Sequence, residues 1–360
     1  MRATFDKWWL LPSGILVASI LMMAGIVFEP PKASETAADC SGALSTDYAC
    51  YQERYQNLVN DSGVQAAFAD LKDEYSKNGF VRSNCHQLSH VIGRAAAEHY
   101  GDIPAAYGQG DSFCGSGYYH GVMQAVVARI GADRILEETD TLCSSELGEN
   151  QKYSLYHRDC VHGLGHGFMG VLGNELFDSL EACDALTDGW EREHCYTGVF
   201  RENVQAKDDP SHPSKYLKAD QPLYPCTDVE TRYKNACYRR QPMYALWMQG
   251  NDFAKVFDLC ARVEDDFRPA CYHGLGRSAF LQSTEQQVTD GGQAGSTRML
   301  CMLGKDHEAR SNCLAGAVKT FIYYNRGATR AEAFCGPFDA DLRAVCLQAA
   351  EEYYEDFAVD

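Results

Sequence analysis

The sequence predicts an all-α protein: a disulfide-stapled array of α/α-hairpin repeats, forming a solenoid or a toroid, after an N-terminal transmembrane helix. Three observations lead to this prediction. Sixteen cysteines recur in pairs, apolar residues between the pairs follow helical spacing, and one apolar stretch near the N-terminus carries no charge. Strict alternation of apolar and polar residues, which would indicate strands, is scarce.

The N-terminal segment has the features of a membrane anchor. The 21 residues from Trp8 to Phe28 are uncharged, long enough to cross a bilayer, and follow Arg2 and Lys7. We therefore interpret residues 1–29 as a cytoplasmic tip and transmembrane signal anchor, and residues 30–39 as a linker. A cleaved signal peptide is the alternative. In both cases residues 40–360 form a cysteine-rich ectodomain in the periplasm or the extracellular space.

The cysteines predict eight disulfides, because an exported chain with an even number of cysteines is expected to oxidise them. Seven pairs are 10 to 17 residues apart: Cys40/Cys50, Cys143/Cys160, Cys183/Cys195, Cys226/Cys237, Cys260/Cys271, Cys301/Cys313 and Cys335/Cys346. Cys85 and Cys114 remain. A disulfide between them is the favoured interpretation, and a pair of thiolate metal ligands is the alternative.

Nine similar segments, which we call heads, each begin at a cysteine. Their cysteines stand at positions 50, 85, 114, 160, 195, 237, 271, 313 and 346. Their spacing of 29 to 46 residues is typical of helical-hairpin arrays. Segments 120–138 and 251–263 show the 3.6-residue apolar pattern of helices. Each unit is therefore predicted as helix, cysteine, turn, cysteine, helix. We expect the links 201–225 and 283–297 to be exposed loops.

Five of the eleven histidines fall in three consecutive heads: His86, His90, His120, His162 and His166. Histidines four residues apart share a helix face and can chelate one metal ion. We predict that these five ligate a transition metal cofactor, iron, copper or zinc, as one five-coordinate ion or two ions. A histidine-rich polar lining without metal is the alternative. The other histidines, at 99, 157, 194, 212 and 307, are expected at the surface, apart from His273.

Five further residues are candidates for an outer layer around the metal: Tyr119, Glu202, Asn203, His273 and Arg277. For the pair His273 and Arg277, anion binding is an equal alternative. Glycine often stands third after the head cysteine, as at Gly163 and Gly198. Close helix packing is the favoured reason, and space for a substrate is the alternative.

Charge and missing motifs exclude several function classes. With 50 acidic and 32 basic residues, the net charge of −18 argues against a nucleic-acid partner. No CxxCH, CxxC, HExxH, GxSxG or phosphate-loop motif is present. Two hypotheses remain. The first is a membrane-anchored metal-dependent oxidoreductase or hydrolase whose catalytic residues the sequence does not identify. The second is a helical scaffold that binds an envelope protein or peptide without catalysis.

Overall fold

The described part of the chain is entirely helical apart from turns and connections. The computed structural model describes residues 39–111, 113–115, 117–144, 154–208, 214–286, 290–325 and 329–356. All of them belong to one compact unit, Ala33–Asp360. No strand occurs in these ranges, so the all-α prediction is confirmed. The predicted transmembrane segment lies outside them, and no helix within them is long and apolar enough to span a membrane.

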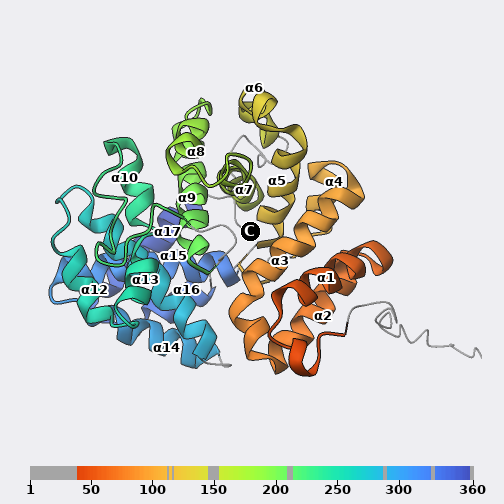
Figure 1. Ribbon diagram of the computed structural model, residues 1–360. Helices are drawn as coiled ribbons and strands as arrows, with labels where there is room; N and C mark the ends of the chain where they lie inside the picture. Colours follow the sequence, from red (N-terminus) through yellow and green to blue (C-terminus); the bar gives the residue numbers. More distant parts are fainter. Residues whose placement is uncertain are drawn as a thin grey trace, which may run out of the picture. The chain divides into compact units, whose positions relative to one another are not determined.

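Seventeen α-helices and two short 3-10 helices follow one another along the described residues (Figure 1). They are η1 Gly42–Leu44, α1 Tyr48–Ser62, α2 Val64–Lys77, α3 Gly79–Tyr100, α4 Ile103–Tyr107, α5 Gly117–Ile130, α6 Ala132–Leu142, α7 Leu155–Val171, α8 Leu176–Cys183, α9 Gly189–Gln205, η4 Ala206–Asp208, α10 Thr231–Tyr238, α11 Pro242–Met248, α12 Phe253–Cys260, α13 Arg268–Gln286, α14 Asp290–Cys301, α15 His307–Asn325, α16 Thr329–Cys335 and α17 Ala340–Asp356.

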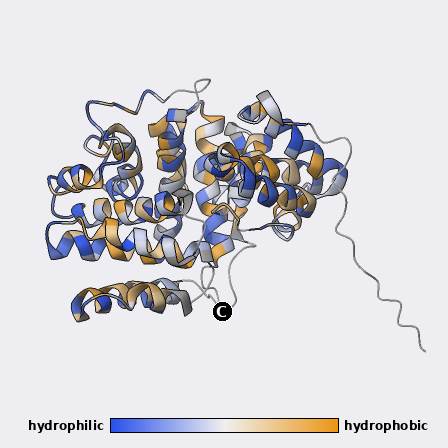
Figure 2. Cartoon of the chain, turned by 90° about the horizontal axis from the view of Figure 1, so that it is seen from below, coloured by the Kyte–Doolittle hydropathy of each residue, from blue (hydrophilic) through white to orange (hydrophobic). Residues whose placement is uncertain are grey.

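The helices that carry the heads pack against one another in chain order. Helix α3 packs on α5, α5 on α7 and α7 on α9, and further along the chain α13 packs on α15 and α15 on α17. The intervening helices, such as α8, α14 and α16, pack against these from the side. Figure 2 shows hydrophobic and hydrophilic residues along most helices, and nearly all of the buried apolar residues belong to one core.

All sixteen cysteines are bonded in the predicted pairs, with Cα–Cα distances of 5.4 to 5.8 Å. Because Cys85 and Cys114 also form a disulfide, the thiolate-ligand alternative for them does not hold. The eight bridges are Cys40–Cys50, Cys85–Cys114, Cys143–Cys160, Cys183–Cys195, Cys226–Cys237, Cys260–Cys271, Cys301–Cys313 and Cys335–Cys346.

In the predicted repeat unit, the second cysteine of each pair precedes the second helix. In the structure it lies inside that helix, in the first or second turn. The helix begins earlier because a polar residue caps it upstream, as Ser154 does for α7 and Asp188 for α9. The cysteines concerned are Cys160 in α7, Cys195 in α9, Cys237 in α10, Cys271 in α13, Cys313 in α15 and Cys346 in α17.

These second cysteines are structural and belong to no functional site. Cys160, Cys237, Cys271 and Cys313 are each 0% exposed and lie in the hydrophobic core. Their sulfur atoms are committed to disulfides, so they offer no thiolate to a metal or a substrate. Most of these bridges instead attach the side of one helix to the end of the helix before it, whereas Cys226–Cys237 attaches α10 to the link that precedes it.

An arginine three residues before a head cysteine secures the turn between two helices. Arg192 Nη1 donates to the carbonyl oxygen of Leu186 at 2.7 Å, and Arg310 Nε donates to that of Gly304 at 2.7 Å. These carbonyls follow a helix end and have no partner within the helix. The disulfide and the arginine thus fix the same turn from both sides.

The row of head helices returns on itself. Tyr323 on α15 donates its hydroxyl to Asp159 on α7 at 2.5 Å, and the guanidinium of Arg158 lies 4.4 Å from the centre of the Tyr323 ring. Leu155 at the start of α7 is buried against the same tyrosine. Helices α7 and α15 are far apart in sequence, and their contact encloses a cavity among α7, α9, α13, α15 and α17.

The predictions that links 201–225 and 283–297 are exposed loops were both wrong in part. Helix α9 continues to Gln205 and is followed by η4, and Tyr216 and Pro225 in the later part of this link are buried. The second link is largely helical, because α13 extends to Gln286 and α14 begins at Asp290. Packing of α14 on α13 and α15 outweighs the poor helix propensity of its glycines.

Candidate metal centre

Three neighbouring helices bring the five predicted histidines together. His86 and His90 lie one turn apart on α3, His162 and His166 lie one turn apart on α7, and His120 lies on α5 between them. We call these five residues the histidine cluster. Their ligand atoms form two groups that share His120, and within each group the atoms lie within 4.8 Å of one another. The five histidines therefore lie close enough, as two triads, to hold a metal ion.

Glycines allow the three helices to approach closely enough. A Cβ atom on Gly121 of α5 would overlap the carbonyl oxygen of His90, and one on Gly198 of α9 would overlap that of His162. Both contacts would be far inside the van der Waals distance. The interpretation of the head glycines as packing residues is therefore correct.

In both histidine pairs the Nε2 atoms of the two rings face each other inside the cluster. The Nε2 atoms of His86 and His90 lie 3.1 Å apart, and those of His162 and His166 lie 3.3 Å apart. Neighbouring rings across the cluster have centroids 4.7 to 5.6 Å apart.

The opposite ring atom, Nδ1, has an outer hydrogen-bond partner in each of these four histidines. The pairs are His86 with the carbonyl of Cys114 at 2.8 Å, His90 with Gln124 Oε1 at 3.2 Å, His162 with Thr197 Oγ1 at 2.9 Å, and His166 with Glu202 Oε2 at 2.5 Å. Carbonyl and carboxylate oxygens only accept, and the Thr197 hydroxyl donates to the His194 carbonyl at 2.7 Å. Nδ1 therefore carries the proton, and in the neutral ring Nε2 carries a lone pair.

His120 differs from the other four. Neither of its ring nitrogens has a hydrogen-bond partner among the described residues, although the side chain is only 3% exposed. The carboxylate of Asp159 approaches Nε2 to 4.0 Å, which is too far for a hydrogen bond. A buried polar group without a protein partner is costly, so in a native protein its partner is expected to be an ordered water or a bound ion.

Burial keeps the cluster uncharged. It is the main cause that lowers the pKa of each of the five histidines below the ordinary value. The charge of Arg201 lowers the pKa of His86 further, and that of Arg240 contributes at His162. At His166 the carboxylate of Glu202 opposes this effect. The neutral imidazole is the form that binds a metal ion.

No protein-family model, curated protein or solved structure matches this chain. The geometry of the histidine cluster therefore carries the functional argument.

Of the five residues predicted around the metal, Glu202 contacts the cluster. Tyr119 instead packs its ring against those of Tyr107, Tyr118 and Tyr156.

The other three predicted residues lie elsewhere. Asn203 accepts a hydrogen bond at 2.5 Å from the hydroxyl of Ser214, which belongs to the link after α9. His273 and Arg277 line the cavity between α7 and α15.

Two histidines expected at the surface are not exposed. His157 is 1% exposed, and its Nε2 lies 2.7 Å from the carboxylate of Glu191. His194 is half-buried and lies against the ring of Trp190, one turn earlier on α9. His157 joins the first turns of α7 and α9, whereas His194 lines the cavity between α7 and α15.

Thr197 and Gln124, which accept hydrogen bonds from the Nδ1 atoms of His162 and His90, were not predicted from the sequence. Thr197 stands second after its head cysteine, on the same helix face as His162 in its own repeat, so the repeat alignment contains the signal. Asp159 is fully buried, but no sequence pattern distinguished it among the 50 acidic residues.

Proposed function

We propose that this protein binds iron, copper or zinc through the histidine cluster, outside the cytoplasm, and that the bound ion serves a redox or hydrolytic reaction. One observation carries the proposal. Four imidazoles, three of them buried and that of His86 half-buried, are held by their Nδ1 atoms with their Nε2 lone pairs facing inward, and His120 between them has no hydrogen-bond partner in the described ranges. Outer acceptors on Nδ1 are the usual support of metal-bound histidines.

The Nε2 distances suit a shared ion. Two nitrogens bound to one ion at about 2.0–2.1 Å lie roughly 3 Å apart when their bonds meet at tetrahedral or octahedral angles. The observed separations are 3.1 and 3.3 Å. Without a cation or an extra proton between them, two inward lone pairs at this distance would repel each other.

Two occupancies agree with the geometry. One ion can be held by one of the two triads, or two ions can each be held by one pair and share His120, which would then bridge them as an imidazolate through its two ring nitrogens. The stoichiometry of bound metal distinguishes them, at one or two ions per chain.

The disulfides support an oxidising environment for the site. All sixteen cysteines are bonded, which is typical of exported proteins. The predicted signal anchor would hold this domain on the outer side of a membrane.

Elemental analysis of the full-length protein tests the proposal. The protein would be produced in an oxidising compartment without a histidine tag, and metals would be quantified by inductively coupled plasma mass spectrometry. We expect near-stoichiometric iron, copper or zinc. The His120→Ala variant and the His162→Ala/His166→Ala variant should each lose most of it.

The matched control removes two exposed histidines, His99 and His307, as the double alanine variant, and should retain the metal. A folded wild-type protein that is metal-free and takes up none of the three ions would contradict the proposal. That result would favour the scaffold hypothesis, in which the helical array binds an envelope protein or peptide.

A further inference from the structure

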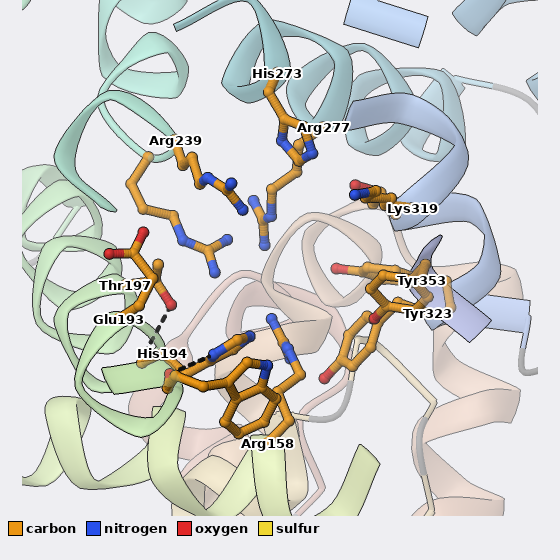
Figure 3. A pocket seen from close by; sticks show the side chains of 14 residues that line it. Arg158, Glu193, His194, Thr197, Arg239, His273, Arg277, Lys319, Tyr323 and Tyr353 are labelled. Carbon is orange, nitrogen blue, oxygen red and sulfur yellow. Dashed lines mark hydrogen bonds between the residues drawn. The ribbon is translucent and has the colours of Figure 1, made fainter. Parts of the chain in front are cut away.

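A second polar site lies beside the histidine cluster. It is the cavity lined by α7, α9, α13, α15, α17 and the turn between α10 and α11, with a volume of about 270 Å³. Figure 3 shows guanidinium groups from different helices converging on one space. Five cationic side chains line it: Arg158, Arg239, Arg240, Arg277 and Lys319. We call this space the basic cavity.

The positive charge of the basic cavity is only partly compensated. Its one lining carboxylate among the described residues is Glu193. Arg158 pairs with Asp159 at 3.0 Å, and Lys319 pairs with Glu352 at 3.3 Å. The other three, Arg239, Arg240 and Arg277, take part in no ion pair within the described ranges.

Burying these charges together is unfavourable. Arg240 is only 6% exposed, and its Nε has no hydrogen-bond partner in the part of the chain described. Burial, followed by the charges of Arg277 and Arg158, lowers the pKa of Arg240 well below its ordinary value. Burial lowers the pKa of Arg277 to about 10. Guanidinium groups nevertheless keep their proton in proteins, so the repulsion persists until an anion relieves it.

We propose that the basic cavity binds a small organic oxyanion, either a phosphate ester or a compound with two or more carboxylates. Planar guanidinium groups match the oxygen spacing of phosphate and carboxylate. The rings of Trp190, Tyr323 and Tyr353 line the same space and provide apolar surface for an organic group. A bare inorganic ion would leave this surface uncovered.

The basic cavity lies next to the histidine cluster and does not depend on it. Thr197 lines the cavity, and its hydroxyl accepts the Nδ1 proton of His162 at 2.9 Å. One side chain therefore separates the anion from the cluster. The anion site is separate from the proposed metal site, because its arginines do not belong to the histidine cluster.

Isothermal titration calorimetry on the full-length protein tests the inference. The probes are phenyl phosphate, citrate and inorganic phosphate, at constant ionic strength set with sodium chloride. We expect phenyl phosphate or citrate to bind at least tenfold more tightly than inorganic phosphate, and the stronger of the two identifies the class. Arg240→Gln and Arg277→Gln should each weaken that binding at least tenfold.

Matched measurements separate binding from general charge and from folding. Arg134→Gln removes one exposed positive charge far from any cavity residue in sequence and should leave binding unchanged. In anion-free buffer Arg240→Gln should raise the melting temperature, because it removes a repelled charge. If that variant does not fold, Lys319→Gln, whose side chain is 24% exposed, is expected to weaken binding as well.

The His120→Ala variant keeps the two proposals distinguishable, since it should lose metal and retain anion binding. Three results would overturn the inference: no binding of any probe, equal weakening by Arg134→Gln, or loss of binding in His120→Ala with binding retained in Arg240→Gln and Arg277→Gln.

Discussion

Glu202 sets the orientation and the electron density of one cluster ring. Its carboxylate accepts the Nδ1 proton of His166 at 2.5 Å, and the carboxyl side chain is 26% exposed while the imidazole is fully buried. A carboxylate in this position makes Nε2 of the histidine more basic and fixes its tautomer. In the proposed metal site, Glu202 would therefore act on the ion through His166.

The Glu202→Gln variant should bind metal about 10- to 100-fold more weakly, because the amide keeps the shape and an acceptor but loses the charge. Competition with a chelator of known affinity measures this change. Glu230→Gln, which removes a carboxylate that is 68% exposed, is the matched control and should retain wild-type affinity. Equal affinities of Glu202→Gln and wild type would show that Glu202 does not support a metal ligand.

At the scale of the element, the crossing of α7 and α9 determines how precisely the cluster is placed. Gly198 on α9 lies directly against the carbonyl oxygen of His162, and Gly165 on α7 lies against that of Cys195. Each helix thus places a glycine against the backbone of the other helix. Neither glycine has an unusual backbone conformation, so the requirement is space alone.

Replacing Gly198 with alanine should push α9 away from α7. Overpacking of this kind destabilises proteins by about 1–3 kcal/mol, and the displaced Thr197 would also release Nδ1 of His162. Chemical denaturation and the chelator competition measure the two effects. Gly189→Ala, in the first turn of the same helix, meets only ordinary contacts and should be neutral or slightly stabilising. Wild-type stability in Gly198→Ala would refute the packing argument.

For the whole molecule, the buried neutral histidines couple stability to pH. Because burial lowers their pKa in the folded protein, the unfolded chain binds more protons once the pH falls below about 6.5. The free energy of unfolding of the metal-free protein should therefore fall on acidification. Each histidine protonated only in the unfolded chain contributes up to about 1.4 kcal/mol per pH unit.

Denaturation of the metal-free protein between pH 7.5 and 5.5 measures this slope. His86→Gln/His90→Gln should have a shallower slope, since two of the groups are removed. His99→Gln, at an exposed position of the same helix, should keep the wild-type slope. Identical slopes for all three proteins would mean that the cluster does not resist protonation.

The sequence predicts those parts of the molecule that the repeat controls. Cysteine spacing identified the eight disulfides, and helical periodicity with the i, i+4 spacing identified the five cluster histidines. The basic cavity was suggested only through His273 and Arg277. Its other side chains come from helices far apart in sequence, and the contact of Tyr323 with Asp159 that encloses it spans 164 residues. Local patterns contain no information about such a contact.

The disulfides described above join consecutive cysteines along the chain, the first with the second and so on, from Cys40–Cys50 through to Cys335–Cys346. During synthesis from the N-terminus, every cysteine therefore meets its native partner before any later cysteine is present. An oxidase acting on the emerging chain can close the bridges in order, without reshuffling wrong pairs through thiol–disulfide exchange. The histidines on α3, α5 and α7 are separated by these bridges and come together only once the helices pack, so loading of the proposed metal ion would follow oxidation.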